Sequence, residues 1–113
     1  NRGKVQTYEL DTDEWTLLGE VTVDDPNAFF GWGVSLDSSG DRLAVSAYGY
    51  NLDGPTRRGL VQVFDYNGTV WNQVGNDLQG TEDREEFGYG IALSSDGSTV
   101  AIGSPRRNGV GSL

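Results

Sequence analysis

The chain alternates apolar and polar residues in short runs separated by turn-forming residues, and this pattern occurs twice. Residues 30–46 contain one extended run, a polar turn around Gly40 and a second extended run. Residues 87–103 repeat the same order of residue types 57 positions later, with the turn around Gly97. Alternation with a period of two, interrupted by Gly, Ser and Asp, predicts a β-hairpin in each copy.

A second hairpin pattern accompanies the first. Residues 3–20 hold two β-rich runs around a polar turn, and residues 59–75 repeat them around Asn67-Gly68. Asn-Gly between alternating runs favours a tight turn in which both residues have positive φ. The positions that recur 56 apart are Gly3 and Gly59, Val5 and Val61, Gln6 and Gln62, Trp15 and Trp71, and Gly19 and Gly75.

Four predicted strands in a repeat of 56–57 residues are typical of a β-propeller blade. No apolar stripe with a period of 3.6 occurs, so no helix is expected. The sequence predicts an all-β chain of four-stranded antiparallel blades, with two repeats cut in mid-blade. We expect strands A to D at about 30–36, 42–48, 60–66 and 70–75. The expected domains are residues 1–28 (second half of a blade, strands C and D), 29–80 (one complete blade) and 81–113 (first half of a further blade, strands A and B).

Two half-blades cannot bury their own faces, so we expect them to complete each other. The partner is either another copy of the chain or the adjacent repeats of a longer polypeptide. In both cases strand B near Ile102 is expected to pair with a strand C like that at Val5. The apolar residues expected to be buried are Phe30, Val34, Leu36, Val45, Val61, Val63, Phe87, Ile91 and Ile102.

Charge and composition exclude several classes of function. Eight Lys and Arg residues stand against 17 Asp and Glu residues, and the resulting net charge of −9 argues against a nucleic-acid partner. The chain has no Cys and no His, which removes thiol chemistry and the commonest general base. No apolar run reaches the length of a membrane span. These features favour a non-enzymatic module.

Motifs in both copies resemble a known family. They are Phe-Gly-x-x-Val or Phe-Gly-x-x-Ile, a turn with Asp and Gly, Leu-Ala-Val or Val-Ala-Ile, and Gly-x-Val-x-Val-Phe at residues 59–64. This order is similar to the FG-GAP repeat, which builds the β-propeller of integrin α subunits and of many secreted or surface proteins of microbes. The resemblance implies strand A innermost in each blade, an extracellular or cell-surface location, and adhesion or recognition in place of catalysis.

The turn between strands A and B departs from the calcium-binding form of that repeat. The calcium loop follows Asp-x-Asp/Asn-x-Asp-Gly-x-x-Asp, whereas this chain has Asp-Ser-Ser-Gly-Asp at 37–41 and Ser-Ser-Asp-Gly-Ser at 94–98. Calcium takes about six to eight oxygen ligands, several of them carboxylates. Neither loop offers more than two carboxylates, so we expect no metal and no cofactor.

Aromatic residues beside the Phe-Gly pairs are the first candidate site. In the integrin propeller, residues flanking Phe-Gly form an aromatic cage that grips a cationic side chain of the partner subunit. The resemblance transfers this role to Phe29, Trp32 and Tyr89, but Glu86 stands where the second copy needs an aromatic residue. Aromatic faces near an acid can hold a cation. The alternative is that Trp32 and Tyr89 fill space between blades.

Trp15 and Trp71 are the second candidates. Each opens a predicted strand D, where packing against the next blade is the main role expected and stacking on carbohydrate the weaker one. A lectin-like propeller that binds a glycan or small ligand is therefore the alternative to a structural, adhesive or protein-binding module. Asn67 heads an Asn-Gly-Thr sequon, so it is a possible N-glycosylation site, although hairpin geometry alone explains the Asn-Gly pair.

Overall fold

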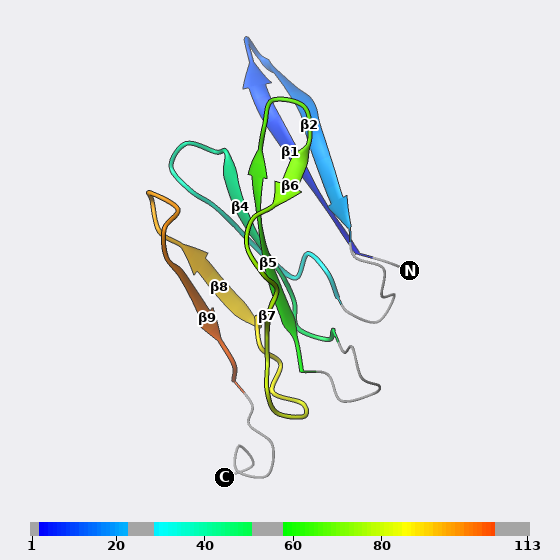
Figure 1. Cartoon of the computed structure of the whole chain (residues 1–113). Coiled ribbons are helices and arrows are strands. Elements are labelled where there is room, and N and C mark those ends of the chain that lie inside the picture. The colour runs from blue at the N-terminus through cyan, green and yellow to red at the C-terminus, as the bar shows by residue number, and fades with distance from the viewer. Residues whose placement is uncertain (1–2, 23–28, 51–57, 106–113) are drawn as a thin grey trace.

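The computed structural model describes residues 3–22, 29–50 and 58–105, and the regular structure in these ranges consists of β-strands (Figure 1). All strand-to-strand pairings are antiparallel, which confirms the predicted all-β class. No described segment forms a helix with the length and apolar character needed to cross a membrane.

The strands form three units along the chain. The first is a hairpin, the second a central sheet in the order β3-β4-β5-β6 with β7 also paired to β5, and the third another hairpin. Figure 1 shows the two hairpins on opposite sides of the central sheet. The strands are β1 (Lys4–Asp11) and β2 (Glu14–Thr22), then β3 (Gly33–Leu36), β4 (Arg42–Ala47), β5 (Leu60–Tyr66), β6 (Trp71–Gln73) and β7 (Leu78–Gln79), then β8 (Gly90–Leu93) and β9 (Val100–Gly103).

The last strand of the repeat differs between the two copies. In the first copy β2 runs unbroken for nine residues against β1, with an irregularity between Thr7 and Tyr8. In the second copy β6 and β7 pair with opposite ends of β5 and are separated by residues 74–77. Gly75 in that interval has φ +74°, a backbone conformation that breaks strand geometry. The short β7 was not predicted from sequence.

The turn at Asn67-Gly68 also differs from its prediction. Only Gly68 has positive φ (+101°), so the expectation of positive φ at both residues is wrong. The connection spans four residues, from Tyr66 to Trp71. The side-chain oxygen of Asn67 accepts hydrogen bonds from the N–H groups of Thr69 and Val70, both at 2.9 Å. These hydrogen bonds to its side chain stabilise a four-residue connection in place of the expected two-residue turn.

The core lies between the β1–β2 hairpin and the central sheet. Its buried members come from β1, β2, β4, β5 and β6 and from the segment before β3: Val5, Val21, Phe30, Leu43, Val45, Ala47, Leu60, Phe64 and Trp71. Three predicted core residues, Phe30, Val45 and Val61, are buried. Val63, Phe87, Ile91 and Ile102 are half-buried.

The prediction of burial is wrong for Val34 and Leu36, which are 52% and 51% exposed. Both lie on β3 and line a groove of about 600 Å³ whose other wall is β1. Their side chains point into this groove, and no described segment fills it. Their cross-strand partners Val45 and Leu43 are covered, because these lie one strand deeper in the sheet.

The two repeats approach their preceding strands with the same geometry. A methyl group added to Gly31 would lie 3.0 Å from the carbonyl oxygen of Lys4 and 3.2 Å from Val5 Cγ2. In the second copy, a methyl group on Gly88 would lie 3.2 Å from the carbonyl oxygen of Leu60 and 3.1 Å from Val61 Cγ2, and also 2.9 Å from Ser46 Cβ. The two glycines have φ +90° and +95°. The equivalence of the repeats thus extends from sequence to the packing between strands.

Candidate functional site

Four aromatic side chains from both repeats gather beside the Phe-Gly turns, and we call Phe29, Trp32, Tyr48 and Tyr89 the aromatic cluster. Phe29 stacks on Tyr48 with ring centroids 5.1 Å apart and an interplanar angle of 8°. Trp32 lies 4.8 Å from Tyr48 and 5.5 Å from Tyr89, and Tyr48 lies 5.2 Å from Tyr89. The three residues singled out from sequence as a possible cage therefore lie together.

The same kind of local turn positions Trp32 in the first repeat and Tyr89 in the second. The N–H of Trp32 donates to the carbonyl of Phe29 at 3.0 Å, and that of Tyr89 donates to the carbonyl of Glu86 at 3.1 Å. Phe29 and Glu86 have φ of 58° and 60°, in the left-handed region that non-glycine residues rarely occupy. Such backbone conformations cost about 1–3 kcal/mol and cluster at binding and catalytic sites.

The cluster leaves a large part of its ring surface open. Phe29, Trp32 and Tyr89 are 44%, 50% and 45% exposed, and Tyr48 is half-buried beneath them. Aromatic faces carry negative electrostatic potential and attract Lys, Arg and other organic cations. The net charge of −9 attracts positively charged ligands to the same protein. Chemically, the cluster can hold a cation or stack on a planar or sugar ring.

Tyr48 was missed by sequence reasoning, which compared equivalent positions of the two copies. Its counterpart in the second copy is Pro105, so no repeated aromatic residue marked the position. The available signal was its place directly after β4, at the end of the strand that pairs with β3. Because β3 and β4 are antiparallel, the residue after β4 lies beside the residue before β3.

Trp71 occupies a packing position. It is 9% exposed, its indole N–H donates to Thr7 Oγ1 at 2.9 Å, and its ring lies 5.1 Å from that of Tyr66. The ring also abuts Gly19 of β2. Burial leaves its ring little surface for a ligand. Its neighbour is the preceding hairpin, not the next blade as predicted, because the side chain points toward β1 and β2.

Trp15 and Asn67 are exposed candidates. Trp15 is 67% exposed at the start of β2, where its position is equivalent to that of Trp71. Asn67 lies in the exposed turn between β5 and β6, with its side-chain oxygen engaged in the turn hydrogen bonds described above. Neither residue lies in the aromatic cluster.

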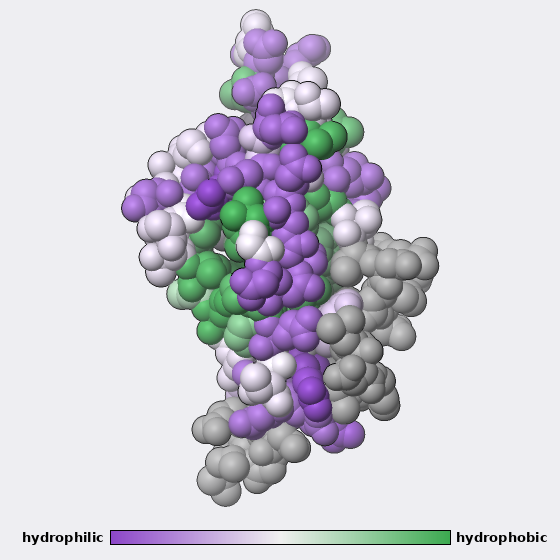
Figure 2. Space-filling view, viewed as in Figure 1, coloured by the Kyte–Doolittle hydropathy of each residue, from purple (hydrophilic) through white to green (hydrophobic). Residues whose placement is uncertain are grey.

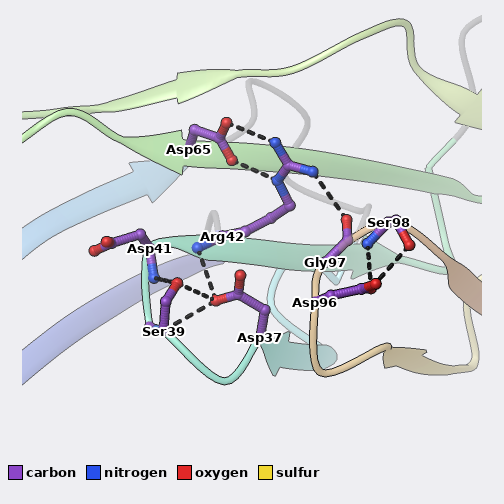
Figure 3. A network of polar contacts seen from close by, with 9 residues as sticks. Asp37, Ser39, Asp41, Arg42, Asp65, Asp96, Gly97 and Ser98 are labelled. Atoms are coloured by element: carbon purple, nitrogen blue, oxygen red, sulfur yellow. Dashed lines mark hydrogen bonds and ion pairs between the residues drawn. The ribbon is translucent and has the colours of Figure 1, made fainter.

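A polar network ties the central sheet to the β8–β9 hairpin (Figure 3). Arg42 on β4 binds Asp65 on β5 through two hydrogen bonds of 2.6 and 2.9 Å, and its third donor reaches the carbonyl of Gly97 at 2.9 Å. The hydrogen bonds from Arg42, aided by its charge, hold the pKa of Asp65 below its ordinary value. Thr99 and Glu9 stand in the equivalent positions of the other repeat, so the sequence pattern did not indicate this pair.

One carboxylate in each A–B turn accepts hydrogen bonds from its own turn. Asp37 accepts hydrogen bonds from the N–H groups of Gly40 and Arg42, and Asp96 accepts from the N–H and hydroxyl of Ser98. The Ser98 bonds lower the pKa of Asp96. Desolvation acts to raise the pKa of Asp37, but its hydrogen bonds outweigh this and lower it. Within residues 3–22, 29–50 and 58–105, no three His, Cys, Asp or Glu residues are grouped to hold a metal ion.

The Arg42–Asp65 pair predicts a loss of stability in acid. A carboxylate whose pKa is lowered by folding stabilises the folded state above its unfolded pKa, and this contribution disappears as pH falls through the folded pKa. Asp65→Asn should therefore lower the melting temperature near neutral pH, and the difference from the parent should shrink as pH falls below the ordinary pKa of Asp, about 3.9. Thermal melts across this range test it, with Asp13→Asn in an exposed turn as control. A difference independent of pH would contradict the prediction.

Comparison with models of known protein families found no match, and no curated protein matches the chain either.

Proposed function

We propose that the chain is a non-enzymatic repeat module of a β-propeller at the cell surface or outside the cell, and that it recognises a protein partner. The FG-GAP-like motifs, the four-strand order of the central sheet and the equivalent contacts of Gly31 and Gly88 support propeller blades. The resemblance also supports the adhesive role and the extracellular setting. The absence of His and Cys from the sequence supports recognition over catalysis.

The aromatic cluster is the observation that carries the recognition role. Four rings contributed by both repeats meet at one place, and three of them keep close to half of their surface exposed. The left-handed residues Phe29 and Glu86 set the turns that aim Trp32 and Tyr89 into the cluster. A Lys or Arg side chain of a partner protein has the chemistry that fits these rings and the acidic protein around them.

A titration with short peptides tests this function. An arginine-containing peptide should shift the side-chain NMR signals of Trp32 and Tyr89, because the guanidinium binds over the rings. The same peptide with citrulline, which keeps the shape and lacks the charge, should shift them far less. Trp32→Ala should abolish the response, and the indole signal of Trp15 reports on non-specific contacts. Equal shifts with both peptides, or shifts at Trp15 alone, would argue against a cation site.

A lectin-like function is the second candidate, and the exposed indoles of Trp15 and Trp32 favour it. Indole faces stack on the apolar faces of sugar rings. A glycan array separates the two functions: selective sugar binding that is lost with Trp15→Ala or Trp32→Ala, together with no preference for arginine over citrulline, would favour the lectin.

A further inference from the structure

Among the features that no described segment covers are the outer edges of β1 and β9 and the groove beside β3. In the described ranges β1 pairs with β2 alone and β9 pairs with β8 alone, so the outer edges of β1 and β9 are open. Open edges are templates for pairing with another strand. The groove of about 600 Å³ between β1 and β3 exposes Val34 and Leu36. Figure 2 shows hydrophobic surface over the region where Figure 1 places β8 and β9.

One contact inside the chain provides the template for filling that groove. The β8–β9 hairpin rests its apolar face on a face of β3 and β4 that carries small residues. A methyl group on Gly33 would lie 3.3 Å from Ile91 Cγ1, and the N–H of Leu93 donates to Ser35 Oγ at 3.0 Å. The N–H of Ser38 donates to the carbonyl of Ser95 at 2.8 Å.

Because the sequence repeats, each of the two surfaces in this contact has an equivalent elsewhere in the chain. No described segment covers either equivalent. The small-residue face recurs on the exposed side of the β8–β9 hairpin. Its members Gly33, Ser35, Ala44 and Ser46 correspond to Gly90, Ala92, Ala101 and Gly103, all exposed. The apolar residues that covered it, Ile91 and Leu93, correspond to the half-exposed Val34 and Leu36. The chain therefore carries two surfaces that match each other and cannot meet within one copy.

We propose that the β8–β9 hairpin of one copy fills the β1–β3 groove of a second copy. Strand β9 then pairs antiparallel with β1 of the second copy as β4 pairs with β5, and the face of Ala92 and Ala101 covers Val34 and Leu36. Translating the β4–β5 register by one repeat pairs Thr99 with Glu9, Val100 with Tyr8, Ala101 with Thr7, Ile102 with Gln6 and Gly103 with Val5. The contact joins different surfaces, so it propagates head to tail into a ring or a filament.

The exposed Trp15 has a place in this contact. Its equivalent Trp71 is buried against Thr7 and Gly19 of the preceding hairpin. The residues equivalent to these two are Val63 and Gly75, in the central sheet. When β1–β2 of the second copy extends the β8–β9 hairpin of the first, Trp15 of the second copy lies against Val63 and Gly75 of the first. Burial of an indole ring there contributes to the contact between copies.

Two differences make the contact between copies weaker than its template. Ala92 lacks the hydroxyl with which Ser35 accepts a hydrogen bond from Leu93. Thr99 and Glu9 replace the ion pair of Arg42 with Asp65. We therefore expect association that depends on protein concentration. Restoring the missing groups by substitution should strengthen it.

Sedimentation of the 113-residue chain over a micromolar to millimolar concentration series measures the association. The parent should form assemblies larger than a monomer as concentration rises. Trp15→Ala should remove this association with little change in far-ultraviolet circular dichroism, because Trp15 is exposed within one copy. Val70→Ala, which truncates another half-exposed apolar residue in the β5–β6 turn, should associate like the parent. A monomer at every concentration, or association unaffected by Trp15→Ala, would overturn the proposal.

A gain of affinity tests the register. Thr99→Arg restores the equivalent of Arg42 and should reach Glu9 of the second copy, which tightens association by up to about fivefold. Adding Glu9→Gln to this variant should cancel the gain. Asn72→Arg adds the same charge on β6 and should give no such dependence on Glu9. A gain from Thr99→Arg that persists with Glu9→Gln would overturn the proposed register. The outcome is independent of the arginine-peptide titration, which tests the aromatic cluster alone.

Discussion

Replacing Gly59 by Ala is expected to lower the free energy of unfolding by about 3–5 kcal/mol. Gly59 has φ +93°, a conformation that costs energy for any residue with a Cβ. Its added methyl group would also lie 2.2 Å from the carbonyl oxygen of Phe87. That oxygen belongs to the backbone, so the segment leading into the β8–β9 hairpin must shift. Urea denaturation of the variant and the parent measures the loss.

Gly68→Ala separates the two contributions to this loss. Gly68 has a similar φ of +101°, but nothing lies within 4 Å of a methyl group added there. Its replacement should cost only the conformational part, about 1–2 kcal/mol. If the two variants lose the same amount of stability, the close approach between Gly59 and Phe87 makes no contribution.

Phe30→Ala is expected to cost about 3–5 kcal/mol, the usual penalty for removing a buried aromatic ring. Phe30 is 4% exposed and belongs to the core that joins the β1–β2 hairpin to the central sheet. Phe87→Ala removes the equivalent ring from the second copy, where it is half-buried, and should cost less. Chemical denaturation at low protein concentration keeps any self-association out of the comparison. A larger loss for Phe87 than for Phe30 would contradict the placement of the core.

Apart from β7, the strands and their order were predictable because local sequence patterns indicated them. Alternation marked each strand, Gly and Asn marked the turns, and the repeat checked each assignment against an equivalent segment. The exposure of Val34 and Leu36 was not predictable from these patterns. Strand alternation shows which residues share a face, whereas burial depends on what covers that face. No described segment fills the groove beside Val34 and Leu36, so these residues are exposed although they fit a core pattern.

The candidate site was predictable in part for a related reason. Trp32 and Tyr89 were found because they repeat, and Tyr48 and the Arg42–Asp65 pair were missed because they do not. The side chain of Trp71 points to the preceding hairpin, a direction that depends on how two units pack. Contacts that occur once in a repetitive chain leave no periodic signal. Here they include the hydrogen bond from Arg42 in the central sheet to Gly97 in the β8–β9 hairpin.

The matching contacts of Gly31 and Gly88 bear on how such a chain can evolve. The contacts common to both glycines are with a backbone carbonyl and one valine methyl, which place few demands on the surrounding side chains; Gly88 also approaches Ser46 Cβ. A gene duplication of 56 or 57 codons therefore reproduces a working junction wherever in the repeat it begins. Exposed positions such as Asn72 and Gln73 can then change independently in each copy. The position of Tyr48 in the aromatic cluster, where the second copy has Pro105, can likewise differ between copies without changing these contacts.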